Sequence, residues 1–230
     1  KVPNWLTPSL PMVRPHDTDI ERLASFLNDG KKITLLCGAG CAGAHPEILT
    51  LAERLNAPIV HALRGKEHVE YDNPYDVGMT GLIGFASGYK AMMSCDTLLM
   101  LGTNFPYRQF YPEHGYIAQI DLRSEALGNR CPLELGLIGD VKLTLQAVLP
   151  KVQQNPDRQH LDTALKDYKK AREDLDALAE SGPDSSIIHP QYLNRLVNEL
   201  ADEDAIFTCD VGTPTAWAAR YLKMNGKRRL

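Results

Sequence analysis

Short runs of consecutive apolar residues alternate along this chain with stretches whose apolar residues recur every three or four positions. A run of the first kind predicts a strand buried on both faces, and a stretch of the second kind predicts an amphipathic helix. The first helix is expected between Asp17 and Gly30, with capping candidates at Asp17, Thr18 and Asp19 and a terminating glycine. Its apolar face consists of Ile20, Leu23, Ala24 and Leu27.

The alternation continues to about residue 150. Further predicted strands cover residues 33–37, 58–63, 97–101, 116–120 and 137–138, and predicted helices cover residues 46–56 and 84–94. Strands that are apolar throughout and alternate with helices are typical of a parallel sheet covered on both faces. We therefore expect an α/β fold, a doubly wound Rossmann-like parallel sheet, over residues 17–150.

The flanking regions have a different character. Residues 1–16 contain four prolines and are expected to form a linker. Residues 151–185 read as a helical linker that ends at a run of small and polar residues, the best domain boundary in the chain. Residues 186–230 predict a helix (190–201), a strand (205–209) and a helix (214–222), which is the first βα unit of a second α/β domain, cut short. Such a unit cannot close its own core, so we expect it to be tethered to residues 17–150, held by another subunit, or mobile.

Composition excludes several classes of protein. A net charge of −4 argues against a nucleic-acid surface, which needs an excess of clustered lysine and arginine. No apolar run approaches the length of a transmembrane helix. The five cysteines are odd in number and contain no C-x-x-C pair, which favours reduced thiols over a disulfide framework or a zinc site.

A glycine-rich turn follows the first predicted strand. Residues 38–43 spell G-x-G-x-x-G between a strand and a helix, the context of a dinucleotide-binding turn, with Gly38 and Gly40 as its first two glycines. A nicotinamide site also needs an acidic residue about 20 positions later. Ala62-Leu63-Arg64 stands there instead. A tight turn without a ligand remains the alternative.

Polar and irregular residues follow the later strands, where open α/β sheets bind their ligands. Thr103 and Asn104 supply hydrogen-bonding groups after the strand over residues 97–101, and Asp121 and Asp140 end two further strands. Each carboxylate could accept a bond from a cofactor or cap the following helix.

The connection over residues 64–84 lacks an obvious regular pattern, and connections of that length are uncommon unless functional. His68, Glu70 and Asp72 lie within it, but their spacing is not that of a metal site, so no metal ligand is predicted. Its end, Thr80-Gly81-Leu82-Ile83, combines backbone freedom with apolar side chains that could support a flat ring.

Three segments of the chain are similar to one known family. Residues 58–84, 102–107 and 207–222 closely resemble the pyruvate dehydrogenase (quinone), or pyruvate oxidase, branch of the thiamine-diphosphate-dependent enzymes, which are related to acetolactate synthase. The resemblance covers essentially the whole chain. It implies that residues 17–150 are the FAD-binding middle domain of a three-domain enzyme and that residues 186–230 begin its thiamine-pyrophosphate-binding domain.

The resemblance also implies a set of FAD-binding residues. They are Thr80, Gly81, Leu82, Ile83, Thr103, Asn104, Phe105, Pro106, Tyr107 and Asp121, with Gly38, Gly40 and Asp140 as further candidates. The catalytic residues and the ligands of thiamine diphosphate and Mg²⁺ would belong to segments that this chain does not contain. No catalytic residue is therefore expected here.

The resemblance implies an oxidoreductase that converts pyruvate to acetate and CO₂ with thiamine diphosphate, Mg²⁺ and FAD, and passes the electrons to ubiquinone. It further implies a cytoplasmic homotetramer that is peripheral on the inner membrane and docks there through a segment absent from this chain. Two alternatives stay open. One is a non-oxidative enzyme of the acetolactate-synthase type with structural FAD, and the other is a nicotinamide-binding or purely structural α/β module.

Overall fold

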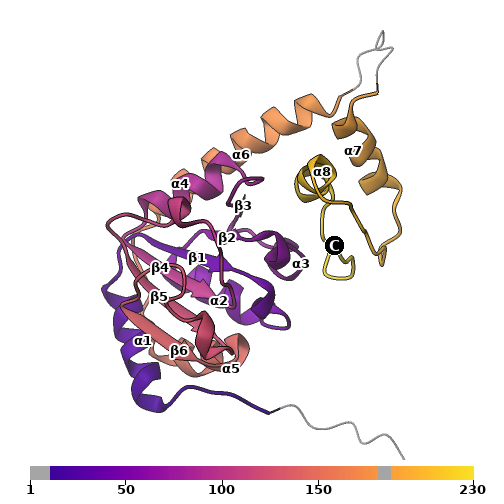
Figure 1. Ribbon diagram of the computed structural model, residues 1–230. Helices are drawn as coiled ribbons and strands as arrows, with labels where there is room; N and C mark the ends of the chain where they lie inside the picture. The colour runs from indigo at the N-terminus through magenta and orange to yellow at the C-terminus, as the bar shows by residue number, and fades with distance from the viewer. Residues whose placement is uncertain (1–10, 181–187) are drawn as a thin grey trace, which may run out of the picture.

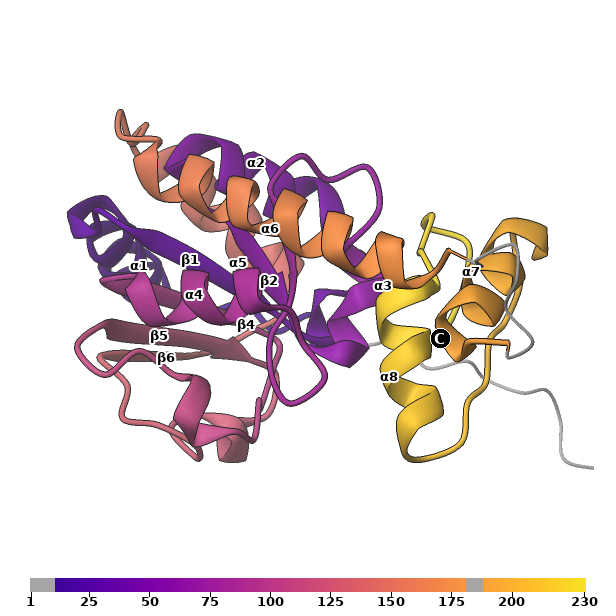
Figure 2. The same cartoon turned by 90° about the horizontal axis from the view of Figure 1, so that it is seen from above.

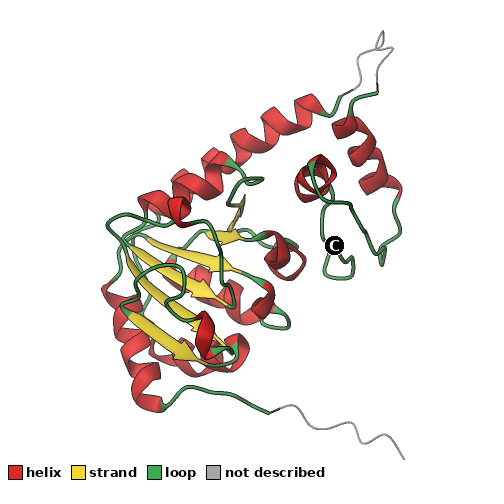
Figure 3. Cartoon of the chain, in the orientation of Figure 1, coloured by secondary structure: helices red, strands yellow, loops and turns green. Residues whose placement is uncertain are grey.

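A six-stranded parallel sheet forms the centre of the molecule (Figures 1 and 3). The computed structural model describes residues 11–180 and 188–230. The strand order is β3-β2-β1-β4-β5-β6, which is the Rossmann order, so the predicted doubly wound α/β class is confirmed. The strands are β1 (Ile33–Cys37), β2 (Ile59–His61), β3 (Asp76–Met79), β4 (Thr97–Leu101), β5 (Tyr116–Asp121) and β6 (Leu135–Ile138).

Helices cover both faces of this sheet. One layer consists of α1 (Asp17–Asp29), α2 (His45–Leu55) and α5 (Val141–Val148), and the opposite layer of α4 (Ala86–Ser94) and α6 (Gln159–Leu178). Neighbouring residues of β1 show the consequence for the sequence, because Leu35 packs in the core of the first layer and Leu36 in that of the second. Both side chains are 0% exposed, so the strand has no polar alternation.

The prediction of an irregular connection over residues 64–84 is wrong. The segment contains a 3-10 helix at Leu63–Gly65, the short helix α3 (Lys66–Val69) and the edge strand β3. Strand β3 is four residues long and includes Asp76 and Gly78, residue types that are depleted in strands. Its place in the sheet is set by pairing with β2, which no local pattern reveals.

The first helix starts and ends differently from the prediction. His16 occupies the N-cap position, and no side chain caps this helix end. Gly30 follows the last turn with a φ of −71°, so it does not adopt the left-handed conformation of a terminating glycine. A Cβ atom at this position would lie 2.7 Å from the Oγ1 of Thr97. Close packing against β4, rather than an unusual φ, requires this glycine.

The C-terminal part contains two helices, α7 (Pro190–Leu200) and α8 (Thr213–Tyr221), but not the predicted strand over residues 205–209. Within residues 188–230 the backbone forms one isolated bridge, between Ile206 and Arg229. A strand needs neighbours that satisfy its amides and carbonyls, and this segment has a single short contact. The predicted boundary at Ser181–Ser186 and residues 1–10 of the predicted linker lie outside the described residues.

Helix α8 docks on the sheet unit, beside the end of α6 (Figure 2). The hydroxyl of Tyr221 donates to the carbonyl of Leu175 in α6 at 3.0 Å, and the Nε of Arg220 donates to the carbonyl of Ile83 at 3.2 Å. Ala219 is buried in a cluster with Met79 and Phe85. The C-terminal residues are therefore tethered to the sheet unit, one of the three expected arrangements. Within the described ranges, no helix has the length and apolarity needed to cross a membrane.

The loops that follow β1 and β4 cross in direct contact. The amide of Gly40 donates to the carbonyl of Gly102 at 3.0 Å, and the amide of Gly38 donates to that of Leu101 at 2.9 Å. A Cβ atom on Gly40 would lie 2.6 Å from the Cα of Gly102, a distance that real Cβ atoms do not tolerate. Glycine is thus required on both sides of the crossing.

We predict that Gly102→Ala lowers the free energy of unfolding more than Gly43→Ala does. Both glycines have positive φ, +56° and +74°, so each alanine carries a backbone strain of about 1–2 kcal/mol. Only Gly102 adds a clash, because its Cβ would lie 2.4 Å from Gly40, whereas nothing lies within 4 Å at Gly43. The clash should add about 1–3 kcal/mol in urea denaturation. Equal losses for the two variants would contradict the crossing as a constraint.

Candidate functional site: a cleft at the carboxyl ends of the strands

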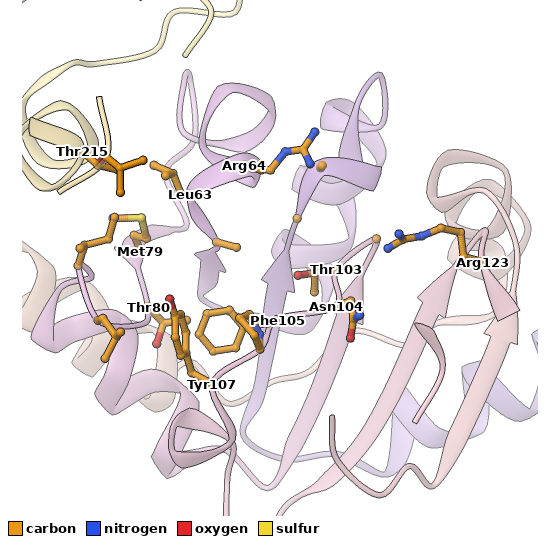
Figure 4. Close-up of a pocket in the computed structure, with 18 of the residues that line it drawn as sticks. Leu63, Arg64, Met79, Thr80, Thr103, Asn104, Phe105, Tyr107, Arg123 and Thr215 are labelled. Atoms are coloured by element: carbon orange, nitrogen blue, oxygen red, sulfur yellow. The ribbon is translucent and has the colours of Figure 1, made fainter. Parts of the chain in front are cut away.

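A cleft of about 560 Å³ opens at the carboxyl edge of the sheet (Figure 4). The loops after β1 and β4 lie on its floor, and these strands flank the point where the strand order reverses. Open α/β sheets bind ligands at this switch point. The volume also lies within the range of about 300–1,000 Å³ that is typical of small-molecule and cofactor sites.

Most of the predicted site residues meet in this cleft. Its lining includes nine of them, namely Gly38, Thr80, Leu82, Ile83, Thr103, Asn104, Phe105, Pro106 and Tyr107. Gly81 is not among the lining residues but packs against one of them, since a Cβ atom there would be 3.3 Å from the ring of Phe105. Three segments that are at least 20 positions apart in the sequence therefore form one surface.

Aromatic packing fixes the loop after β4. The ring of Phe105 makes edge contacts with the rings of Tyr107, Phe110 and Tyr111, at centroid distances of 5.3, 6.2 and 5.9 Å. The hydroxyl of Tyr111 donates to the carbonyl of Phe105 at 2.6 Å. Buried Gln119 adds a further brace, because its amide donates to the carbonyl of Thr103 at 3.0 Å. The loop is thus preorganised as a rigid apolar wall with a few polar groups.

The segment after β3 presents an unpaired hydroxyl. Thr80 is 3% exposed and lines the cleft, yet its Oγ1 atom has no hydrogen-bond partner among the described residues. Figure 4 shows its side chain beside the rings of Phe105 and Tyr107. A buried hydroxyl without a partner is costly, so this atom is suited to bond a ligand.

The glycine-rich turn has a packing role. The amides of Gly38 and Gly40 already donate to carbonyls at the end of β4, so neither is free to bind a phosphate. Gly38 still lines the cleft through its backbone, whereas Gly40 is not among the lining residues.

The two predicted carboxylates lie outside the lining of the cleft. Asp121 is 5% exposed at the end of β5, where it accepts the amide of Arg123 at 2.9 Å. Asp140 caps α5 by accepting the amide of Leu143 at 2.9 Å. The structure therefore gives Asp140 the helix-cap role that the sequence left open, and it places Asp121 next to a cleft residue.

Two cationic side chains that the sequence did not point to as site residues border the cleft. Arg64 follows β2 and Arg123 follows β5, and Figure 4 shows both guanidinium groups directed toward the same part of the cleft. A search for cations after strand ends, in addition to carboxylates, would have found them. Val211, Gly212 and Thr215 of the C-terminal part also line the cleft, which nothing in their sequence pattern indicates.

A buried His–Asp pair joins β2 and β3 close to residues that line the cleft. The Nδ1 of His61 donates to the carbonyl of Ala62 at 3.2 Å, and its Nε2 lies 3.5 Å from Oδ1 of Asp76. Burial lowers the pKa of His61 to about 4. Burial, followed by the negative charge of Glu70, raises the pKa of Asp76 to about 7. At mildly acidic pH, between about 4 and 7, the histidine is therefore neutral and the proton resides on the aspartate.

These opposite shifts predict compensating pH effects on stability. Between about pH 4 and pH 6.5 the unfolded chain binds a proton at His61 that the folded protein lacks. Over nearly the same range the folded protein binds a proton at Asp76 that the unfolded chain lacks, because its ordinary pKa is 3.8. The two contributions to the pH slope of the unfolding free energy cancel.

We predict that a substitution of either residue makes the pH dependence of the unfolding free energy that comes from the other residue measurable. In Asp76→Asn, the unfolding free energy should fall as the pH decreases from 6.5 toward 4, by at most about 1.4 kcal/mol per pH unit. In His61→Gln, it should fall as the pH rises from about 4 to about 7. Urea denaturation across this pH range measures both, with the double variant as the control. Parallel pH profiles for the two single variants would contradict the assigned protonation states.

Comparisons with known proteins agree with this architecture. The chain is 61% identical over 176 residues to an uncharacterized 42.6 kDa protein in the isoamylase 3′ region of Pseudomonas amyloderamosa, a match that covers 76% of this chain and 44% of that protein. It is 28% identical to the acetolactate synthase large subunit of Cyanidium caldarium, over 95% of this chain and 39% of that protein. It is 26% identical to the pyruvate oxidase of Lactiplantibacillus plantarum, over 98% and 37%.

The chain thus spans less than half the length of these relatives. A family model described as the thiamine pyrophosphate enzyme central domain matches residues 20–148, which is more than half of the chain and includes the whole sheet. The chain therefore belongs to the thiamine pyrophosphate enzymes and contains their central domain.

Proposed function

We propose that the cleft binds FAD. The observation that carries this proposal is the convergence, at the switch point of the sheet, of a preorganised aromatic wall with the unpaired hydroxyl of Thr80. A flavin offers the matching features, since its ring is flat and apolar on both faces and polar along its edge. The available residues fit the cofactor by this criterion.

Different residues of the cleft would bind different parts of FAD. Thr80–Ile83, together with Phe105 and Tyr107, would hold the flavin ring, with the Thr80 hydroxyl on its polar edge. Arg64 and Arg123 would neutralise the diphosphate, because guanidinium groups form strong charge-assisted bonds to phosphate oxygens. Asp121 would act at the adenosine end. When bound, FAD supplies two-electron redox chemistry, while the protein contributes orientation and exclusion of water.

We infer a substrate for the whole protein from its family and its resemblance. It would decarboxylate pyruvate oxidatively to acetate and CO₂ with thiamine diphosphate and Mg²⁺, and would pass the electrons through FAD to ubiquinone. We propose further that the whole protein is a homotetramer and is peripheral on the inner membrane. The similarity to a protein named pyruvate oxidase supports it.

A second candidate is acetolactate synthesis with structural FAD. The chain is as similar to an acetolactate synthase as to a pyruvate oxidase, at 28% and 26% identity. A nicotinamide cofactor is disfavoured, since Arg64 rather than an acidic residue follows β2.

We expect the intact protein to reduce a soluble ubiquinone analogue when it is supplied with pyruvate, thiamine diphosphate, Mg²⁺ and FAD. Acetate and reduced quinone should form in equal amounts. An assay of both products, with acetolactate measured in the same samples, distinguishes the candidates. Acetolactate formation without quinone reduction would favour the second function.

We predict that Gly81→Val reduces the FAD content of the purified protein far more than Gly128→Val does. Both glycines have positive φ, +102° and +68°, so both substitutions strain the backbone. Only a side chain at position 81 would crowd the ring of Phe105, which a Cβ atom approaches to 3.3 Å, whereas the nearest atom to a Cβ atom at position 128 lies at 3.9 Å, an ordinary contact distance. The flavin absorbance per protein measures the content. Stoichiometric flavin in folded Gly81→Val would show that this segment does not contact the cofactor.

A further inference from the structure

Strand β3 contains one extra residue next to the cleft. Ile59 of β2 pairs with Asp76, and His61 pairs with Met79, so two steps along β2 match three steps along β3. Gly78 lies within this irregularity and has a φ of +84°. The strand therefore bulges immediately before Thr80, and bulges beside functional sites commonly redirect the side chains that follow.

The carboxyl group of Asp76 braces the bulge. Its Oδ1 atom accepts the amide of Gly78 at 3.2 Å and also faces His61 at 3.5 Å. The side chain is 6% exposed. The rings of Phe85 and Tyr168 pack against Gly78 so closely that a Cβ atom there would lie 2.7 and 2.9 Å from them. The bulge is thus held by a buried hydrogen bond on one side and by aromatic rings on the other.

The direction of the cleft segment depends on this bulge. Side chains alternate between the two faces of a strand. One extra residue therefore places each residue that follows it in the strand on the opposite face from the one it would otherwise occupy. The chain is then anchored again at once, since the amide of Thr80 donates to the carbonyl of His61 at 3.1 Å and that of Phe85 to Met79 at 2.7 Å. Thr80 and Ile83 line the cleft from this fixed position.

We propose that Asp76 is a positioning residue of the cleft, whose buried carboxyl group holds the β3 bulge and so directs the Thr80–Ile83 segment at the cofactor. The bulge and its brace are properties of the chain itself, and only the identity of the ligand rests on the proposed function. Among the residues that the structure describes, Asp76 makes no hydrogen bond to a residue that lines the cleft, so it acts through the backbone at Gly78.

Three substitutions in the intact protein test this role. Asp76→Ala removes the brace. Asp76→Val removes it with a side chain of similar size that favours strands, and Asp76→Asn keeps an oxygen that can accept the Gly78 amide. Asp96→Ala is the matched control. Asp96 also bonds backbone amides, those of Lys31 and Lys32 at 3.1 and 3.0 Å, but at the amino end of β4, away from the cleft.

Two measurements separate the inference from the proposed function. Amide hydrogen exchange of residues 80–85, recorded without FAD, should accelerate in Asp76→Ala and Asp76→Val but not in Asp76→Asn or Asp96→Ala. Titration of the FAD-depleted proteins with FAD should show affinity weakened by about tenfold or more in the same two variants, as expected for loss of a buried hydrogen bond.

Unchanged exchange of residues 80–85 in folded Asp76→Ala or Asp76→Val would overturn the inference, and so would an equal change in Asp96→Ala. Failure of both variants to fold would also overturn it, because Asp76 would then serve the fold rather than the cleft. If the unsubstituted protein binds no FAD, the proposed function fails, while the exchange comparison still decides the role of Asp76.

Discussion

The contact between the backbones of Gly40 and Gly102 is the constraint on which the site depends. The two loops that leave β1 and β4 touch through backbone atoms, with the Gly40 amide bonded to the Gly102 carbonyl at 3.0 Å. Beyond this contact the chain continues to α2 on one side and to the aromatic loop on the other. The cleft lies over the crossing, so a side chain at either glycine would displace the floor of the site as well as the sheet.

Rigid elements surround this floor on three sides. The aromatic cluster around Phe105 fixes the loop after β4, and the bulge at Gly78 fixes the segment after β3. The third side comes from the C-terminal part, since Arg220 of α8 bonds the carbonyls of Ile83 and Gly84. Binding sites built on such supports need little reorganisation when a ligand arrives, which favours affinity.

Buried charged and titratable side chains near the cleft form one cluster, in which one ion pair lies beside two groups that are neutral at mildly acidic pH. Lys66 is almost completely buried and forms an ion pair with Glu70, which also accepts the amide of Met224 at 2.9 Å. Burial, followed by the negative charge of Glu70, raises the pKa of Asp76 to about 7, so its neutral form is favoured beside the neutral His61 at mildly acidic pH. The same cluster thus braces β3 and anchors the C-terminal segment on α3, which links two parts of the chain that the sequence presents as separate units.

Local pattern by itself determined the layered architecture of this protein. Strands such as Ile33–Cys37 are buried at every position, so their sequences are largely apolar on both faces. This pattern can be recognised without a structure. The segments around Thr80 and Thr103 could also be predicted as candidate site residues, through a resemblance carried by contiguous residues, and the structure places them along one cleft.

The tertiary structure decided whatever depends on partners that are distant in the sequence. Strand β3 is set by pairing with β2, and the failed strand near Ile206 lacks such neighbours. Gly38 and Gly40 match a phosphate-binding pattern, yet carbonyls at the end of β4 and directly after it, more than 60 positions away, accept their amides. Arg64, Arg123 and Thr215 join the cleft for the same reason, because proximity across the carboxyl edge of a sheet leaves no trace in local hydrophobic periodicity.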